Sequence, residues 1–127
     1  MKRIVIADDS GTARMMICRC LEIIGLADAE FAEAENGKEG LTLVKQEPTD
    51  LLISDLNMPI MDGESLLKWV KASPKLVDLP VLIITSAGNQ AKTDKLLEMG
   101  AFAVINKPIN PAMLSEVLAP LIDSEDS

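Results

Sequence analysis

Five short apolar runs recur along the chain, and the spacing of their hydrophobic positions predicts that each forms a β-strand. Four of the runs are continuously apolar, which is typical of strands buried on both faces of a sheet. The remaining run alternates polar and apolar positions, which indicates a strand nearer the sheet edge. The continuous runs occupy residues 3–7, 51–54, 81–85 and 102–106, and the alternating run occupies residues 30–34.

Helical patterns separate these strands. The clearest is an apolar stripe at the 3.6-residue period, and Gly25 is expected to end that helix. The stripe consists of Ala13, Met16, Ile17, Cys20, Leu21 and Ile24. A second stripe, formed by Leu114, Val117, Leu118 and Leu121, predicts a helix at the C-terminal end. Weaker patterns predict helices over residues 38–46, 64–72 and 90–99, ended near Pro48, Pro74 and Gly100.

This alternation of strands and helices predicts an α/β fold on a parallel sheet, because each parallel return needs a crossover helix. We expect one five-stranded, doubly wound domain over residues 1–122, followed by a frayed acidic tail over residues 123–127. In such sheets, functional groups gather beyond the carboxyl ends of the strands. The residues that end the predicted strands are therefore the first candidates for a site.

Polar residues stand at the ends of four predicted strands. Asp8 and Asp9 follow the first strand, Asp55 ends the third, Thr85 ends the fourth and Lys107 follows the fifth. Carboxylates gathered at one edge would repel one another, which predicts a divalent metal among them. Oxygen ligands completed by water or phosphate favour Mg²⁺. We hypothesise that Asp55 accepts a phosphoryl group while Lys107 and Thr85 contact the transferred oxygens.

Taken one at a time, these residues have simpler explanations. Asp8 and Asp9 suit the start of a helix, Thr85 is typical of a strand-end hydroxyl, and Lys107 is typical of a solvated charge. Asp55 differs because it ends a buried apolar strand, where an uncompensated carboxylate is costly. The coincidence of all these residues at strand ends is what favours a functional site.

The composition of the chain disfavours or excludes several classes of function. The net charge of −8 and a pI near 4.4 disfavour contact with nucleic acid or anionic lipid. The first apolar run meets Asp8 too early for a signal sequence, so we expect a cytoplasmic protein without membrane insertion. The chain has no histidine, which excludes imidazole triads, histidine metal ligands and phosphohistidine.

The sulfur-containing and aromatic side chains are interpreted as packing residues. Cys18 and Cys20 are two positions apart in a predicted helix and cannot form a disulfide with each other there. Trp69 is interpreted as a packing residue rather than a partner contact. Four methionines are interpreted as core and loop packing residues rather than as a soft metal site, namely Met15, Met16, Met58 and Met61.

Four motifs at the strand ends carry a resemblance that covers nearly the entire chain. They are Asp8-Asp9-Ser10, the run at 55–63 from Asp55 to Gly63, Ile84-Thr85-Ser86-Ala87 and Asn106-Lys107-Pro108. In these motifs the sequence closely resembles the response regulator receiver family. The resemblance implies a flavodoxin-like fold with strand order 2-1-3-4-5. It also implies that Asp55 takes phosphate from a histidine kinase, a phosphotransfer protein or a small phosphodonor.

Further roles follow from the same resemblance. It implies that Asp8 and Asp9 hold Mg²⁺ directly or through water, and that Asp55 and the main-chain carbonyl of Asn57 complete the protein ligands. Lys107 becomes the phosphate contact, with a cis bond before Pro108, and Thr85 the residue that moves toward phosphate. Output is expected through the face of the fourth helix, fifth strand and fifth helix, in a monomer or weak dimer.

The sequence departs from the family pattern at Val104, where many members carry an aromatic residue that reports phosphorylation. Phe102 shares a strand face with Val104 but does not occupy the matching position. We hypothesise that movement of Thr85 still biases the fourth helix and fifth strand, with Val104 repacking in place of a ring.

Three alternatives stay open. A flavin mononucleotide carrier on the same fold is disfavoured because Asp8 and Asp9 stand where a flavin phosphate needs amide donors. A phosphatase with an aspartyl nucleophile is disfavoured because Asn57 stands where a second acid is needed, so we expect no turnover beyond the protein's own phosphate. The chain is expected to be a stand-alone regulator, for example in chemotaxis, rather than a receiver excised from a longer regulator or hybrid kinase.

Overall fold

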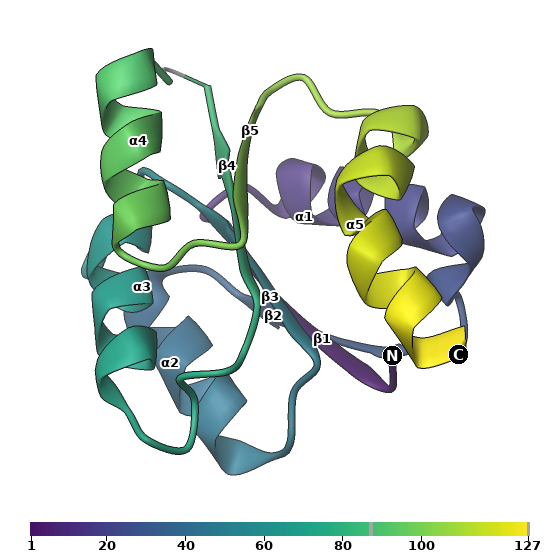
Figure 1. Ribbon diagram of the computed structural model, residues 1–127, viewed down its shortest axis with the longest axis horizontal. Helices are drawn as coiled ribbons and strands as arrows, with labels where there is room; N and C mark the ends of the chain where they lie inside the picture. The colour runs from purple at the N-terminus through teal and green to yellow at the C-terminus, as the bar shows by residue number, and fades with distance from the viewer. Residues whose placement is uncertain (87, 127) are drawn as a thin grey trace.

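A single five-stranded parallel sheet forms the centre of the protein (Figure 1). The computed structural model describes residues 1–86 and 88–126. The strands are β1 (Arg3–Ala7), β2 (Glu30–Ala34), β3 (Leu51–Asp55), β4 (Val81–Thr85) and β5 (Ala103–Asn106). Their spatial order is β2-β1-β3-β4-β5 and every neighbouring pair is parallel, which confirms the predicted strand order.

Helices cover both faces of this sheet, as the parallel connections require. They are α1 (Gly11–Leu21), followed by the π-helical turn η1 (Glu22–Leu26), α2 (Gly37–Gln46), α3 (Gly63–Ala72), α4 (Gln90–Glu98) and α5 (Pro111–Asp126). Figure 1 shows α1 and α5 on one side of the sheet and α2, α3 and α4 on the other. Side chains that accept backbone N–H groups start the helices, and these caps are Ser10, Asn36, Asp62, Asn89 and Asn110.

Two apolar clusters join the helices to the sheet because successive strand residues point to opposite faces. On the α2, α3 and α4 side the core contains Val5, Leu52, Ile83, Leu67 and Leu96 among others. On the α1 and α5 side it contains Ile4, Ile53, Ile84, Leu21 and Leu118 among others. Strands β1, β3 and β4 are buried along their whole length, as their continuous apolar runs predicted. The same prediction was wrong for β5, which is an edge strand and is only half-buried or exposed.

Several boundaries differ from those expected. β5 begins at Ala103 rather than at residue 102. α1 ends at Leu21, and the turn that follows is π-helical with Gly25 at a φ of +102°, a conformation that glycine adopts without steric cost. α4 ends at Glu98 rather than at residue 99. α5 continues to Asp126, so most of the segment expected to fray is helical, while Ser127 lies outside the described residues.

The packing interpretation was wrong for three large apolar residues. Trp69 is 56% exposed, because Leu66, Leu67 and Val70 fill the buried face of α3 and Trp69 lies away from it. Met15 and Met16 are more than half exposed, since α1 buries a different face.

The packing interpretation was correct for Met58 and Met61, which pack against the core. Both cysteines are free thiols, as expected. Among the described residues, no helix is long and apolar enough to cross a bilayer.

Candidate functional site

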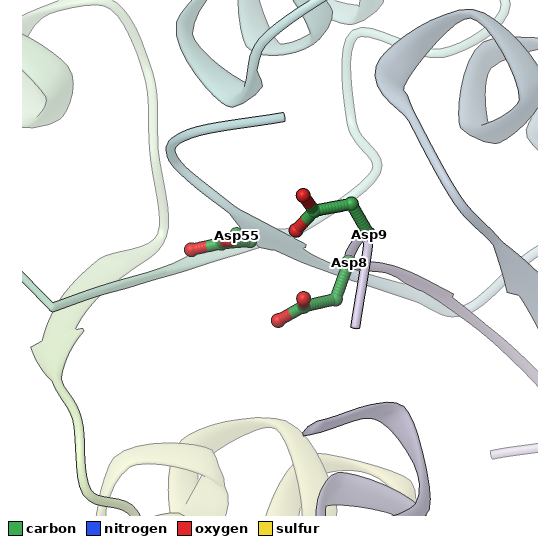
Figure 2. A group of neighbouring side chains, drawn as sticks. All are labelled: Asp8, Asp9 and Asp55. Carbon is green, nitrogen blue, oxygen red and sulfur yellow. The ribbon is translucent and has the colours of Figure 1, made fainter. Parts of the chain in front are cut away.

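Three carboxylates meet at the carboxyl edge of the sheet. Asp8 and Asp9 directly follow β1, and Asp55 ends the neighbouring strand β3. One oxygen from each side chain lies within 4.8 Å of the others. Figure 2 shows the side chains of Asp8 and Asp9, which directly follow β1, beside that of Asp55 at the end of β3. Asp8 and Asp55 are buried, whereas Asp9 is exposed, so the cluster opens to solvent on the side of Asp9.

The side chain of Lys107 reaches this cluster from the end of β5. Its Nζ donates a hydrogen bond to Oδ2 of Asp8 at 3.0 Å and lies 3.6 Å from Oδ1 of Asp55. One ammonium group therefore contacts two carboxylates that come from two other strands. Four of the residues predicted from the sequence are thus neighbours in space, namely Asp8, Asp9, Asp55 and Lys107.

Burial and mutual repulsion control the charges in this cluster. The pKa of Asp55 is raised, first because the carboxylate loses solvation on burial and then because the negative charge of Asp8 is close. Lys107 offsets part of this rise. Burial works against the charge of Lys107 too, but its contacts with Asp8 and Asp55 outweigh that effect and raise its pKa. Lys107 therefore carries a positive charge. This single charge is not enough to compensate the negative charges of three carboxylates.

Asp8 is held in place by Ser10, which the sequence showed only as part of a motif, and by Arg14, which the sequence did not single out. The backbone N–H of Ser10 donates to Oδ1 of Asp8 at 2.9 Å, and the Arg14 guanidinium donates to the Asp8 carbonyl at 2.6 Å. Arg14 is oriented in turn by an ion pair of 2.9 Å with Glu33. The sequence did not indicate this role of Arg14, because an arginine at a helix start is usually a solvated charge.

The main chain around Asp55 is equally constrained. Oδ1 of Asp55 accepts a hydrogen bond from the N–H of Leu56 at 2.9 Å, and the buried Ser54 hydroxyl donates to the Asp55 carbonyl at 2.8 Å. Gly63 packs directly on that carbonyl, and a methyl group added there would overlap it. The sequence showed Gly63 only as part of a turn, whereas its packing requires the absence of a side chain.

The remaining predicted site residues lie at the same edge of the sheet. Thr85 is 1% exposed at the end of β4, and its carbonyl accepts the N–H of Lys107 at 2.9 Å. The peptide bond between Lys107 and Pro108 is cis, as expected. Asn57 is exposed and follows Leu56 by one position, so its main chain lies in the loop directly after the acceptor candidate. The ligand role of its carbonyl stays a prediction.

The chemistry of these side chains suits a hard divalent cation. Three carboxylates face one ammonium group, and burial together with the nearby charge of Asp8 raises the pKa of Asp55. Oxygen ligands with one solvent-accessible side match Mg²⁺, which retains several waters when it binds to proteins. The donor set contains no nitrogen or sulfur ligand, so it does not match a structural zinc site.

Comparison with known proteins bears on this geometry directly. The family model described as Response regulator receiver domain matches residues 4–119, which covers all five strands apart from Arg3 and includes the whole acidic cluster. The chain belongs to the response regulator receiver family.

Individual receivers agree with this assignment. The chain is 36% identical to the chemotaxis protein CheY homolog of Campylobacter jejuni, over 94% of this chain and 92% of that protein. It is 34% identical to the chemotaxis protein CheY1 of Helicobacter pylori, over 98% and 99% of the two chains. A solved signal receiver domain of a signal transduction histidine kinase from Syntrophus aciditrophicus has a TM-score of 0.83 at 31% identity, covering 98% of this chain and 92% of that one.

These similarities decide between the open alternatives at the level of the family. The protein is a phosphorylation-activated response regulator receiver, which is a phosphoacceptor signalling domain. Neither the family match nor the related chains support the flavin mononucleotide carrier. The receiver assignment leaves the roles of individual residues to be argued from the site itself.

Proposed function

We propose that Asp55 is the phosphoryl acceptor of this receiver. The observation that carries the proposal is the position of its carboxylate, which is buried at the end of β3 yet belongs to an acidic cluster with one solvent-accessible side. The N–H of Leu56 and the ammonium of Lys107 fix the orientation of Oδ1. An oriented, poorly solvated carboxylate is a suitable nucleophile for in-line attack on phosphorus.

In the proposed reaction, a carboxylate oxygen of Asp55 forms a bond to phosphorus while the bond between phosphorus and the donor breaks. The donor leaves with the electron pair of that bond, as acetate if acetyl phosphate is the donor. Lys107 lies beside Asp55 and can neutralise negative charge on the transferred oxygens, which is the main requirement of phosphoryl transfer. Thr85, one strand away, supplies a hydroxyl for the same oxygens once phosphate is present.

We assign the metal ligands to Asp8, Asp9, Asp55 and the main-chain carbonyl of Asn57, with Mg²⁺ as the cofactor. Bound Mg²⁺ supplies positive charge that compensates the carboxylates and binds phosphoryl oxygens. Asp8 is well placed to act as a ligand because Ser10, Arg14 and Lys107 hold its carboxyl group and main chain in one orientation.

We propose a histidine kinase or phosphotransfer protein as the phosphate donor, which membership of the receiver family supports. The downstream protein contacts the face formed by α4, β5 and α5. The similarity to chemotaxis proteins supports a role in chemotaxis-type signalling. Direct contact with nucleic acid is disfavoured by the net charge of −8. Cytoplasmic location and a monomer or weak dimer stay predictions.

Intact mass measurement tests the acceptor. The protein is mixed with acetyl phosphate and Mg²⁺, and we expect one added phosphoryl group. Asp55→Asn and the wild-type protein with a chelator should both remain unmodified. Asp28→Asn, which changes an exposed aspartate outside the cluster, is the matched control and should gain the phosphoryl group normally. Phosphorylation of Asp55→Asn at the wild-type rate would disprove the assignment.

A second measurement separates this role from that of a phosphatase. We propose that hydrolysis is confined to the phosphate on Asp55, because Asn57 offers an amide where a general acid and base would be needed. Incubation with an added phosphomonoester should therefore release no phosphate beyond one equivalent. Sustained turnover would overturn this part of the proposal.

The context of the domain is a separate question from its chemistry. The alignments with the chemotaxis proteins of Campylobacter jejuni and Helicobacter pylori cover 92% and 99% of those proteins. The solved receiver domain of a histidine kinase shows that a chain with this fold also occurs in a kinase. The acceptor chemistry proposed for Asp55 is the same in both contexts.

A further inference from the structure

Helix α4 is held to the rest of the domain by few buried contacts. Of its nine residues, all of which the structure describes, only Leu96 is buried. The neighbouring helix α3 buries Gly63, Leu66, Leu67 and Val70. A helix with one buried side chain gains little free energy from apolar packing, so polar contacts at its edges contribute a larger share of what fixes its position.

The principal polar contact between α3 and α4 centres on Glu64. Its Oε1 forms a close ion pair with Nζ of Lys92, and its Oε2 lies 3.4 Å from Nζ of Lys95. The two lysines are three positions apart and therefore lie on the same face of α4. Glu64 and Lys92 are 27% and 35% exposed, so water screens their ion pair only in part, whereas Lys95 is 58% exposed and its ion pair is the weaker one. In agreement, the pKa of Glu64 is lowered, chiefly by the hydrogen bond from Lys92.

Glu64 is also adjacent to the acceptor strand. It directly follows Gly63, which packs on the carbonyl of Asp55 and whose N–H donates to the Leu56 carbonyl at 2.8 Å. The start of α3 is therefore fixed to the main chain that carries the acceptor carboxylate. The ion pairs of Glu64 connect the start of α3 to α4. The N-cap residue of α4, Asn89, lies four positions after Thr85.

We propose that the ion pairs of Glu64 with Lys92 and Lys95 restrain α4 in its resting position and thereby set how readily the receiver switches. The inference rests on the proposed function, since it assumes that phosphate at Asp55 displaces α4. A restraint of this kind stabilises the resting state and not the activated one, so its loss shifts the population toward the activated state. The partner face that includes α4 is then partly formed before phosphorylation.

Glu64→Gln is the direct test, because it removes the charge and keeps the shape of the side chain. Backbone amide signals of residues 90–98 are compared in the apo protein and with beryllofluoride, a phosphate mimic. We expect the apo variant signals to move part of the way along the line from apo to beryllofluoride positions. Phosphorylation by acetyl phosphate and amide exchange in α4 should both become about two- to five-fold faster, as the loss of a part-exposed ion pair implies.

Two controls distinguish this restraint from a general effect of charge. Glu98→Gln removes the same charge from an exposed position on α4 itself and should leave the signals at their wild-type positions. The reversed cluster, Glu64→Lys with Lys92→Glu and Lys95→Glu, restores the attraction with exchanged signs and should return α4 to the resting signals.

The outcomes separate this inference from the proposed function. If the wild-type α4 signals respond to beryllofluoride but those of apo Glu64→Gln coincide with apo wild type, the restraint does not exist and the proposed function stands. If the wild-type signals do not respond to beryllofluoride, α4 is not displaced and this inference fails, whereas the acceptor role of Asp55 is decided separately by the intact mass measurement. Failure of the reversed cluster to restore the resting signals would also overturn the inference.

Discussion

The Nζ of Lys107 donates a hydrogen bond to Oδ2 of Asp8 at 3.0 Å, although 99 positions separate these residues in the chain. The contact forms because β1 and β5 both end at the carboxyl edge of the sheet, on either side of β3 and β4. Asp8 is 1% exposed, so the ammonium compensates a carboxylate that has lost nearly all of its solvent. A parallel sheet thus gathers acidic and basic side chains that the sequence keeps far apart.

The acceptor carboxylate itself should destabilise the fold when no metal is present. Burial and the charge of Asp8 raise the pKa of Asp55, so its ionised form at pH 7 is less stable in the folded than in the unfolded protein. We expect Asp55→Asn to raise the free energy of unfolding by on the order of 1 kcal/mol in chelator, measured by urea denaturation at pH 7.

The exposed Asp28→Asn is again the control and should change stability by less than about 0.5 kcal/mol. Added Mg²⁺ should stabilise the wild type more than Asp55→Asn, because the variant lacks one of the charged ligands. A loss of stability in Asp55→Asn would mean that the carboxylate is compensated within the apo fold.

Close packing at Gly63 should make that position intolerant of any side chain. An added methyl group would overlap the Asp55 carbonyl and lie 3.0 Å from Cα of Leu56, so main-chain atoms would have to move. We expect Gly63→Ala to lose about 2–3 kcal/mol in urea denaturation. Gly11→Ala is the matched control, because the nearest side-chain atom lies 3.5 Å away and alanine favours the helix. Equal effects of the two substitutions would contradict the packing argument.

Arg3 should contribute to stability without contributing to phosphorylation. The side chain is buried, and Nη1 donates to the Leu43 carbonyl at 2.8 Å and to Oγ1 of Thr49 at 2.9 Å. Arg3→Met leaves these acceptors without their donor, and we expect a loss of about 2–3 kcal/mol by urea denaturation. The rate of labelling by acetyl phosphate should be unchanged in the folded variant, since Arg3 begins β1 at the opposite edge from Asp8.

Lys2→Met provides the comparison for Arg3, because Lys2 is exposed and one position away. We expect it to change stability by less than about 0.5 kcal/mol. A labelling defect in folded Arg3→Met would show that the amino edge of the sheet influences the acceptor site.

The contribution of Glu64 to stability should depend on pH. Its pKa is lowered chiefly by the hydrogen bond from Lys92, so the folded protein holds this carboxylate's proton less tightly than the unfolded chain does. The stabilisation is therefore complete above the ordinary glutamate value of 4.5 and is lost as the pH falls through the lower folded value. At pH 7 we expect Glu64→Gln to cost no more than about 1 kcal/mol.

Urea denaturation of wild type and Glu64→Gln from pH 7 down to pH 3 checks this sign. The difference between the two proteins should shrink below pH 4.5. A difference that stays constant across this range would show that the effect of the substitution does not come from the charge.

The elements of the fold were predictable where the pattern is local and strong. The continuous apolar runs located β1, β3 and β4, because strands buried on both faces exclude polar residues along their length. The stripe of the first helix was less reliable, since Met16 belongs to it and is 53% exposed. Periodicity indicates which residues share a side of a helix, whereas the neighbouring elements decide how much of that side they cover.

The sequence by itself determined the strands, their alternation with helices, and the polar residues at the strand ends from which Asp55 was predicted as the acceptor. Only the tertiary structure decided the contact of Lys107 with Asp8, the packing of Gly63 on the Asp55 carbonyl, and the ion pairs between Glu64 and α4. The physical reason is the separation of the residues along the chain. A hydrophobic pattern relates residues a few positions apart, whereas strand register and close packing bring together side chains that are distant in the sequence.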